Sequence, residues 1–329
     1  MKLLYITDTH IRATSPANRT DDFIETLKAK FREVGHLAQM HEVDAILHGG
    51  DFFDIPNPSL AICGDFVALM KEWGKPIYGI AGNHDLFGHN PDTLSRTMLG
   101  FINRLGIVRL IHPGERVFLE KGGVRVQLSG QHYHYELDRR DPRLDYCIQE
   151  KEADVAIHLV HGMLLDRKFM DGVAHTVVDQ IVETAADMTL CGHNHLGFPP
   201  VETNGKVFYN PGGFVRLSNH PVDVQRIPQA LLIDVTDGSL TYRAIPLESA
   251  PNGEEVIDCS KKEEAAFMEQ RLAQFVQGIK AAGDYKAVDI GAILNEIADR
   301  DGLPADVREE AMRRIAAAEE RLAAGSANR

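Results

Sequence analysis

Seven side chains of the kinds that bind metal ions stand just after short apolar runs of this sequence. They are carboxylates, imidazoles and one amide, and they comprise Asp8, His10, Asp51, Asn83, His161, His193 and His195. Because alternate side chains of a strand point to one face, His193 and His195 should point the same way where the run MTLC ends. Such ligands, without thiolates, suit manganese, iron or zinc. Seven ligands exceed the needs of one ion, so the set predicts two ions roughly 3.5 to 4 Å apart that share one carboxylate, as in phosphoryl transfer.

The elements that must position these residues are strands that alternate with helices. In the first half, apolar runs and helical patterns alternate at 2–6, 21–41, 43–47, 58–73, 76–81 and 91–105. Further strands with less helix between them are predicted at 124–129, 155–160, 188–191, 206–210, 230–235 and 240–245. The sequence therefore predicts an α/β fold, a two-sheet β-sandwich core flanked by helices. The seven side chains stand at strand ends, where open α/β sheets build their sites.

The pattern changes at about Pro251, after which no strand is predicted. Apolar residues recur at helical spacing from Met268 to Leu322, which predicts three amphipathic helices. We therefore expect a catalytic domain over residues 1–250 and a C-terminal helical extension over residues 251–329. The extension either caps the core or docks a partner, and the sequence favours neither.

Composition limits the environment and the partners. Four widely separated cysteines without a C-x-x-C pair predict reduced thiols and a cytoplasmic location. No apolar run approaches the roughly 18 residues that span a bilayer, so no membrane is expected as a partner. The formal net charge of −13 repels nucleic acid. A phosphate-bearing substrate must therefore be attracted by local positive charge.

Five motifs, DTH, GDFFD, GNHD, HG and GHNH, follow one another in an order that resembles the calcineurin-like metallophosphoesterases over about residues 1–245. The resemblance implies the fold of that family and assigns the ligands to two ions. One ion would be held by Asp8, His10, Asp51 and His195, and the other by Asp51, Asn83, His161 and His193. Asp51 would bridge the two ions.

The resemblance also implies catalytic residues outside the ligand set. His84 of the GNHD motif would orient the phosphate and help to protonate the leaving oxygen, which requires an imidazole with a pKa near neutrality. Asp85 is expected to hold the orientation of His84. The two cations would lower the pKa of water, so no side-chain nucleophile is required.

The stretches GDFFDIPNPS and YNPGGFVRLS resemble DNA repair exonucleases of the SbcD type. This implies a phosphodiesterase acting on DNA, an exonuclease or endonuclease subunit of a repair or recombination complex. Manganese is the most expected metal, with iron or zinc as alternatives. The C-terminal helices would dock an SMC-like coiled-coil ATPase of the SbcC type, and a homodimer is a further expectation. Asp54 stands where many members of that group have a histidine, so the role of that histidine is not carried over.

Four residues are candidates for contacts with DNA. Arg12 and Arg216 would bind backbone phosphates, and His132 and Tyr133 of the loop GQHYHYE would stack on a base. Two other functions remain open. One is a phosphodiesterase for small molecules such as cyclic nucleotides, and the other is a scaffold that keeps the fold without catalysis.

Overall fold

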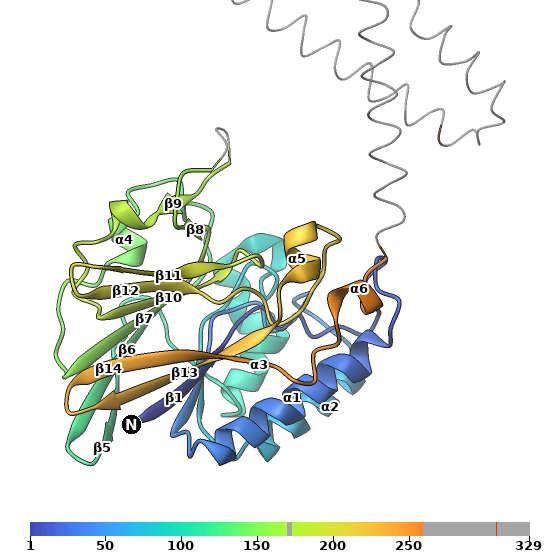
Figure 1. Cartoon of the computed structure of the whole chain (residues 1–329), viewed down its shortest axis with the longest axis horizontal. Helices are drawn as coiled ribbons and strands as arrows, with labels where there is room; N and C mark the ends of the chain where they lie inside the picture. The colour runs from blue at the N-terminus through green and yellow to red at the C-terminus, as the bar shows by residue number, and fades with distance from the viewer. Residues whose placement is uncertain (170–172, 259–306, 308–329) are drawn as a thin grey trace, which may run out of the picture. The chain divides into compact units, whose positions relative to one another are not determined.

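The computed structural model describes residues 1–169, 173–258 and 307, and this described part is built around two six-stranded sheets (Figure 1). The first sheet has the order β14 (Ser239–Pro246), β13 (Gln229–Thr236), β1 (Lys2–Ile6), β2 (Ala45–His48), β3 (Ile77–Gly79) and β4 (Arg109–Leu110). The second has the order β11 (Phe198–Thr203), β12 (Lys206–Asn210), β10 (Met188–His193), β7 (Val155–Gly162), β6 (Val124–Gln131) and β5 (Val117–Lys121). Four neighbouring strands of each sheet are parallel. They are β1, β2, β3 and β4 in the first sheet and β12, β10, β7 and β6 in the second.

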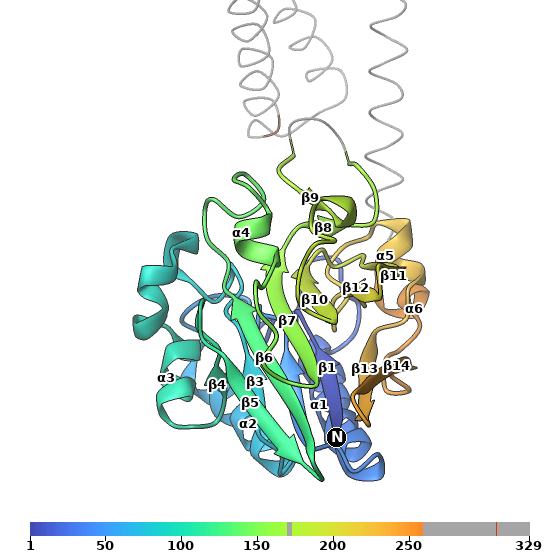
Figure 2. The same ribbon diagram turned by 90° about the vertical axis from the view of Figure 1, so that its left-hand side faces the viewer.

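The two faces of the first sheet are buried in different ways. Leu4 and Ile6 of β1 pack in the core formed with the helices, whereas Leu3 and Tyr5 pack in the core between the two sheets. This alternation follows from the two-residue period of a strand. The inter-sheet core takes Leu190 and other apolar side chains from the second sheet. Figure 2 shows the two sheets facing each other.

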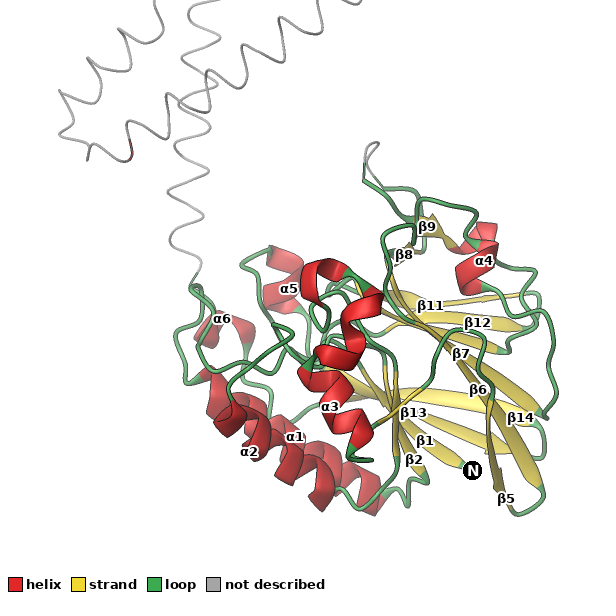
Figure 3. Ribbon diagram, turned by 180° about the vertical axis from the view of Figure 1, so that it is seen from behind, coloured by secondary structure: helices red, strands yellow, loops and turns green. Residues whose placement is uncertain are grey.

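Helices cover the outer face of the first sheet. The longer ones are α1 (Phe23–Met40) and α2 (Leu60–Glu72), which lie side by side in Figures 1 and 3. Their first turns are capped by Asp22 and Ser59, whose side chains accept hydrogen bonds from the backbone N–H groups of Glu25 and Ile62. Shorter elements are η1 (Phe87–His89), η2 (Pro91–Arg96), α3 (Met98–Arg104), α4 (Arg143–Tyr146), β8 (Leu164–Leu165), β9 (Thr176–Val177), η3 (Val178–Gln180), α5 (Pro221–Gln225) and α6 (Gly253–Val256).

The predicted fold class is confirmed, since two facing sheets are flanked by helices. The three amphipathic helices predicted from Met268 to Leu322 lie outside the described residues. Residues 251–258 are described, and they pack against α5, where Val224 contacts Val256 and Ile257. Among the described residues, no helix is both long and apolar enough to cross a membrane.

Candidate metal centre

The seven predicted ligands lie in the loops and strand ends at one edge of the two sheets. β1, β2 and β3 of the first sheet lead to Asp8, His10, Asp51 and Asn83. In the second sheet, His161 is the last residue but one of β7, β10 ends with His193, and His195 follows. Because parallel strands bring their carboxyl ends to the same edge, residues 187 positions apart in the chain meet here.

One group of possible ligands consists of Asp8, His10, Asp51 and His195, whose nitrogen and oxygen atoms lie within 4.8 Å of one another. The Nε2 atoms of His10 and His195 are 3.0 Å apart. Nε2 of His195 is 3.5 Å from Oδ1 of Asp8, and Nε2 of His10 is 3.5 Å from Oδ2 of Asp51. Four donor atoms therefore converge on a space of the size of one ion.

A second group contains Asp51 again, with His161 and His193. Nε2 of His161 is 3.2 Å from Oδ2 of Asp51. Oδ1 of Asn83 is 3.3 Å from Nε2 of His161 and 2.9 Å from Nδ1 of His193. The two groups thus share Asp51, which is the arrangement required for a carboxylate that bridges two ions.

The chemical state of these donors fits divalent metals. Nδ1 of His161 donates a hydrogen bond to the carbonyl oxygen of Gly49 at 2.8 Å, which directs Nε2 toward Asp51 and Asn83. Burial opposes protonation of His161, but the charge of Asp51 outweighs it and raises the pKa of His161 to about 9, so a metal ion at Nε2 would replace that proton. Burial lowers the pKa of His10, and burial lowers that of His193 to about 4, so both imidazoles are neutral and their lone pairs are available. Burial opposes ionisation of Asp51, but the charge of His161 outweighs it and holds the pKa well below its usual range.

The backbone is strained at four of the seven residues. Asp8, His10, Asp51 and His193 have φ angles of 55°, 43°, 52° and 78°, in the left-handed region that non-glycine residues rarely adopt. Such conformations cost of order 1–3 kcal/mol each and cluster at functional sites. Gly82 allows the two loops to meet, because a Cβ atom there would lie 2.1 Å from Oδ1 of Asp51. The strain is evidence that the donor positions matter more than local stability.

The comparisons with known proteins agree with this geometry. The family described as "Calcineurin-like phosphoesterase" matches residues 1–197, which include every predicted ligand. The chain belongs to the calcineurin-like phosphoesterase family. It is similar to "DNA double-strand break repair protein Mre11" of Halobacterium salinarum, with 23% identity over 324 residues, covering 91% of this chain and 78% of that protein.

Two further similarities were found. "Double-strand break repair protein MRE11" of Coprinopsis cinerea is 26% identical over 284 residues, which cover 66% of this chain and 37% of that protein. Among solved structures, TT1561 of Thermus thermophilus aligns with a TM-score of 0.42 and 13% identity, over 74% of this chain and 98% of that one. The membership of the family supports a hydrolase that acts with divalent metals on phosphoesters.

His84 lies beside the candidate metal centre of this phosphoesterase and belongs to neither of the two groups that share Asp51. With His10 and Asp54 it forms a third set of possible ligand atoms, which also lie within 4.8 Å of one another. Its backbone N–H donates to Oδ1 of Asp51 at 2.9 Å, and its ring centroid is 4.8 Å from that of His10. Nδ1 of His84 donates to the backbone carbonyl of Asp54 at 2.9 Å. Nε2 is therefore the ring nitrogen left to exchange a proton with a substrate.

The predicted role of Asp85 is wrong. Its carboxylate is fully buried and accepts hydrogen bonds from the backbone N–H groups of Phe52, Phe53 and Gly82, at 3.2, 3.0 and 2.9 Å. It therefore ties the loop that contains Asp51 to the GNHD loop and does not hold His84. The physical reason is that neighbouring residues of a turn point in different directions, and Asp85 points into the protein.

Asp54 makes the contact with His84 that was expected of Asp85. Its carbonyl holds His84, and its Oδ1 lies 3.5 Å from Nδ1 of His10. Its Oδ2 is 3.2 Å from a guanidinium nitrogen of Arg12. The feature of the sequence that could have indicated this contact is the motif GDFFD, which places Asp54 three residues after Asp51.

Arg216 was predicted to bind DNA phosphates, and the structure corrects this. Its side chain is 2% exposed. Its guanidinium donates to the carbonyl oxygen of Arg226 through Nε and Nη2, at 2.9 and 2.7 Å, and to that of Pro251 at 2.7 Å. The side chain is thus occupied in holding three segments of backbone together. Arg12, by contrast, is partly exposed and stands two residues after His10.

The two aromatic candidates differ in their surroundings. His132 is 4% exposed, and its Nδ1 accepts a hydrogen bond from the backbone N–H of Ala81 at 3.1 Å, so it is not free to stack on a base. Tyr133 is partly exposed, and its ring centroid lies 5.8 Å from that of His193. Of the pair, only Tyr133 presents a ring beside the candidate metal centre.

Proposed function

We propose that this chain hydrolyses phosphodiester bonds of DNA with two divalent metal ions. The observation that carries the proposal is the pair of ligand groups that share Asp51, with His84 beside them. The similarity to proteins named as Mre11 double-strand break repair proteins supports DNA as the substrate. We take manganese as the native metal, with iron or zinc as the alternatives.

Each residue would have a distinct task. Asp8, His10, Asp51 and His195 would hold one ion, and Asp51, Asn83, His161 and His193 the other. When bound, the two ions supply Lewis acidity to the phosphate and lower the pKa of water. His84, fixed through Nδ1, would give a proton from Nε2 to the leaving oxygen. Arg12 would neutralise charge on a backbone phosphate near this group.

The wider role is proposed on the same basis. We infer a nuclease subunit of a repair or recombination complex in the cytoplasm, with residues 1–250 as its catalytic domain. Residues 251–329 would dock a coiled-coil ATPase of the SMC-like class, and two copies of the chain would associate as a homodimer. Co-purification of the full chain with such an ATPase, lost on truncation at residue 258, would test the docking role.

The hydrolysis itself is tested with the purified full chain in manganese. Linear double-stranded DNA, single-stranded DNA and bis-p-nitrophenyl phosphate are compared, with Asp51→Asn as the inactive variant. Asp65→Asn is the matched control, because Asp65 is an exposed carboxylate of α2 that pairs with Lys28. We expect DNA cleavage by the wild type and by Asp65→Asn, and none by Asp51→Asn.

The other outcomes identify the other functions. Cleavage of the small diester without cleavage of DNA would reject DNA as the substrate of the isolated chain and favour a small-molecule phosphodiesterase, a function that the net charge of −13 also suits. Hydrolysis of neither substrate in the presence of bound metal would identify a scaffold that keeps the fold without catalysis.

A further inference from the structure

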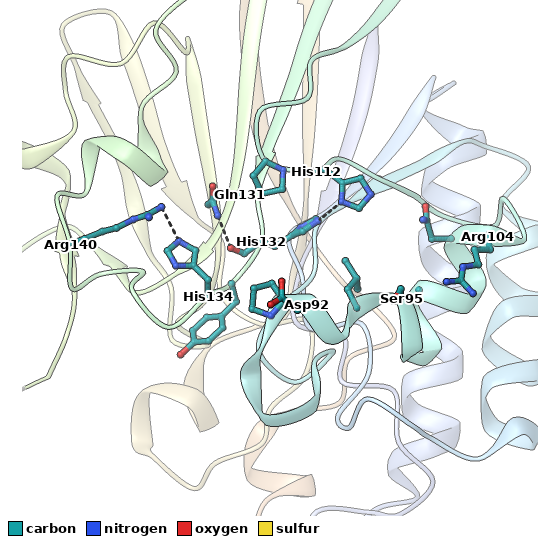
Figure 4. A pocket seen from close by; sticks show the side chains of 14 residues that line it. Asp92, Ser95, Arg104, His112, Gln131, His132, His134 and Arg140 are labelled. Atoms are coloured by element: carbon teal, nitrogen blue, oxygen red, sulfur yellow. Dashed lines mark hydrogen bonds between the residues drawn. The ribbon is translucent and has the colours of Figure 1, made fainter.

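A cavity of about 550 Å³ lies between the end of β6, the loop that follows it, and the segment formed by η2 and α3 (Figure 4). Its walls include Gln131, His132 and Tyr133 on one side and Ser95 and Asn103 on the other. Cavities that hold small organic ligands measure about 300–1,000 Å³. The space is therefore large enough for one nucleotide.

The cavity wall is tied to the candidate metal centre. The backbone N–H of Tyr133 donates to the carbonyl oxygen of Ala81 at 3.0 Å, and Ala81 donates to His132 at 3.1 Å. Ala81 precedes by two residues Asn83, a predicted ligand. The ring of Tyr133 borders the cavity and lies 5.8 Å from the ring of His193. A molecule in the cavity is thus separated from the ligand groups by about one side chain.

Three of the hydrogen-bonding side chains on the walls are neutral, and two of them have groups left for a ligand. Oδ1 of Asn103 accepts from the backbone N–H of Leu110, which leaves its amide NH₂ group for a ligand. Nε2 of Gln131 donates to the carbonyl oxygen of His132, which leaves its Oε1. Burial lowers the pKa of His132 to about 3, so that ring stays neutral. Neutral donors and acceptors beside an aromatic ring suit a nucleobase.

A guanidinium group lies at each end of the cavity. Figure 4 shows Arg104 at one end and Arg140 at the other, with Asp92 between them. Arg140 forms an ion pair with the buried carboxylate of Asp145, through Nε at 2.9 Å and through Nη2, which orients the guanidinium and leaves Nη1 for a ligand. Arg104 is exposed, and within the described part of the chain it has no ion-pair partner, so its guanidinium is available to a phosphate. Asp92 disfavours a phosphate in the middle, where a base would lie.

We infer that this cavity binds the nucleoside adjacent to the scissile phosphodiester, with its flanking phosphates at Arg104 and Arg140. The inference rests on the proposed function, because it assumes a nucleic-acid strand at the metal centre. Tyr133 would separate the base from the ions and fix the distance between the nucleoside and the bond that is cut. A free nucleotide carries the same base and phosphate as a nucleotide within a strand, so it could occupy the same cavity, and the test must distinguish the two.

The test measures binding to the full chain in manganese by titration calorimetry. The probes are a phosphorothioate tetranucleotide, which resists hydrolysis, and deoxyadenosine monophosphate. Arg104→Ala removes the unpaired charge, and Ser95→Trp fills the cavity from an exposed position. Arg96→Ala is the matched control, because Arg96 is an exposed arginine of the same segment that does not line the cavity.

We expect Arg104→Ala to raise Kd for the tetranucleotide by about tenfold, the effect of losing one charged hydrogen bond. Ser95→Trp should also raise Kd, because the indole occupies the space of the base, whereas Arg96→Ala should leave Kd unchanged. Turnover of saturating bis-p-nitrophenyl phosphate should stay unchanged in Arg96→Ala, which shows that a surface arginine of this segment can be removed without harm to the metal centre. An unchanged Kd, or equal weakening in Arg96→Ala, would overturn the inference. Binding of the mononucleotide alone would reject the strand as the source. Failure of the proposed function appears separately, as absence of hydrolysis by the wild type.

Discussion

Replacement of Asp85 separates a structural role from a catalytic one within the GNHD motif. The carboxylate of Asp85 is the acceptor for three buried backbone N–H groups, those of Phe52, Phe53 and Gly82. An unsatisfied buried donor costs about 1–3 kcal/mol, so Asp85→Ala should lower the free energy of unfolding by at least about 3 kcal/mol. For a domain of this size that corresponds to a fall in Tm of about 6–12 °C. Asp85→Asn retains one acceptor oxygen, so its Tm should lie between those of the wild type and Asp85→Ala.

His84→Ala is the matched comparison, because the two residues are neighbours with different partners. His84 is partly exposed, and its side chain makes one hydrogen bond, to the carbonyl oxygen of Asp54. We expect its Tm to stay within about 3 °C of the wild type, since surface substitutions rarely exceed ~0.5–1 kcal/mol. Loss of a positioned general acid should lower turnover by about 10²- to 10⁴-fold.

The assay combines thermal unfolding by circular dichroism with turnover of bis-p-nitrophenyl phosphate in manganese. Metal content is measured on the same samples, so that loss of an ion is not mistaken for loss of a proton donor. The reasoning is refuted if Asp85→Ala unfolds at the wild-type temperature while its turnover falls as far as that of His84→Ala. That result would return Asp85 to the catalytic group.

Three further predictions follow from buried charges and from the ligand groups. Arg216→Met should lower the free energy of unfolding by about 2–4 kcal/mol, because it leaves the carbonyls of Arg226 and Pro251 unpaired. The affinity for DNA should stay unchanged. Weaker DNA binding by a variant of wild-type stability would contradict this prediction. Burial and nearby guanidiniums hold the pKa of Lys30 in the folded protein well below its ordinary 10.5. Between the folded pKa and 10.5 the unfolded chain binds more protons, so the free energy of unfolding of the wild type should rise with pH. Urea unfolding at pH 7 and 9.5 measures this rise, which Lys30→Met should lack. Manganese at 100 times its Kd should stabilise the wild type by about 2.7 kcal/mol, and chelation should remove this; Asp51→Asn should show neither effect in thermal unfolding.

The strands that carry the ligands could be predicted because they are buried on both faces. All residues of β2 and β7 are buried, and such strands appear in a sequence as short continuous apolar runs. Edge strands lack this signal. β11 contains Pro199 and Pro200 and only one of its six residues is buried, and β5 ends in charged residues, so neither was predicted. β4 has two residues, too few for any pattern.

The ligand types and their order were visible in the sequence, whereas the surroundings of each side chain were not. Asp85 follows His84 directly, yet adjacency does not say that one faces the site and the other the interior. The guanidinium of Arg216 is saturated by carbonyls 10 and 35 residues away, contacts that only the tertiary fold creates. A charged residue near a motif is therefore a weak indication of a substrate contact until its burial is known.

The spacing of the donors is set by two different kinds of contact. Within the second sheet, the ladder between β7 and β10 pairs Gly192 with His161, so hydrogen bonds of the backbone fix His193 relative to His161. Between the sheets, the distance from these histidines to Asp51 depends on the apolar core that includes Leu47 and Leu190. An ion shared by Asp51 and His161 would link the two sheets across that core. Metal affinity should therefore respond to packing changes far from any ligand, because close-packed interiors transmit a change of volume to the groups that they support.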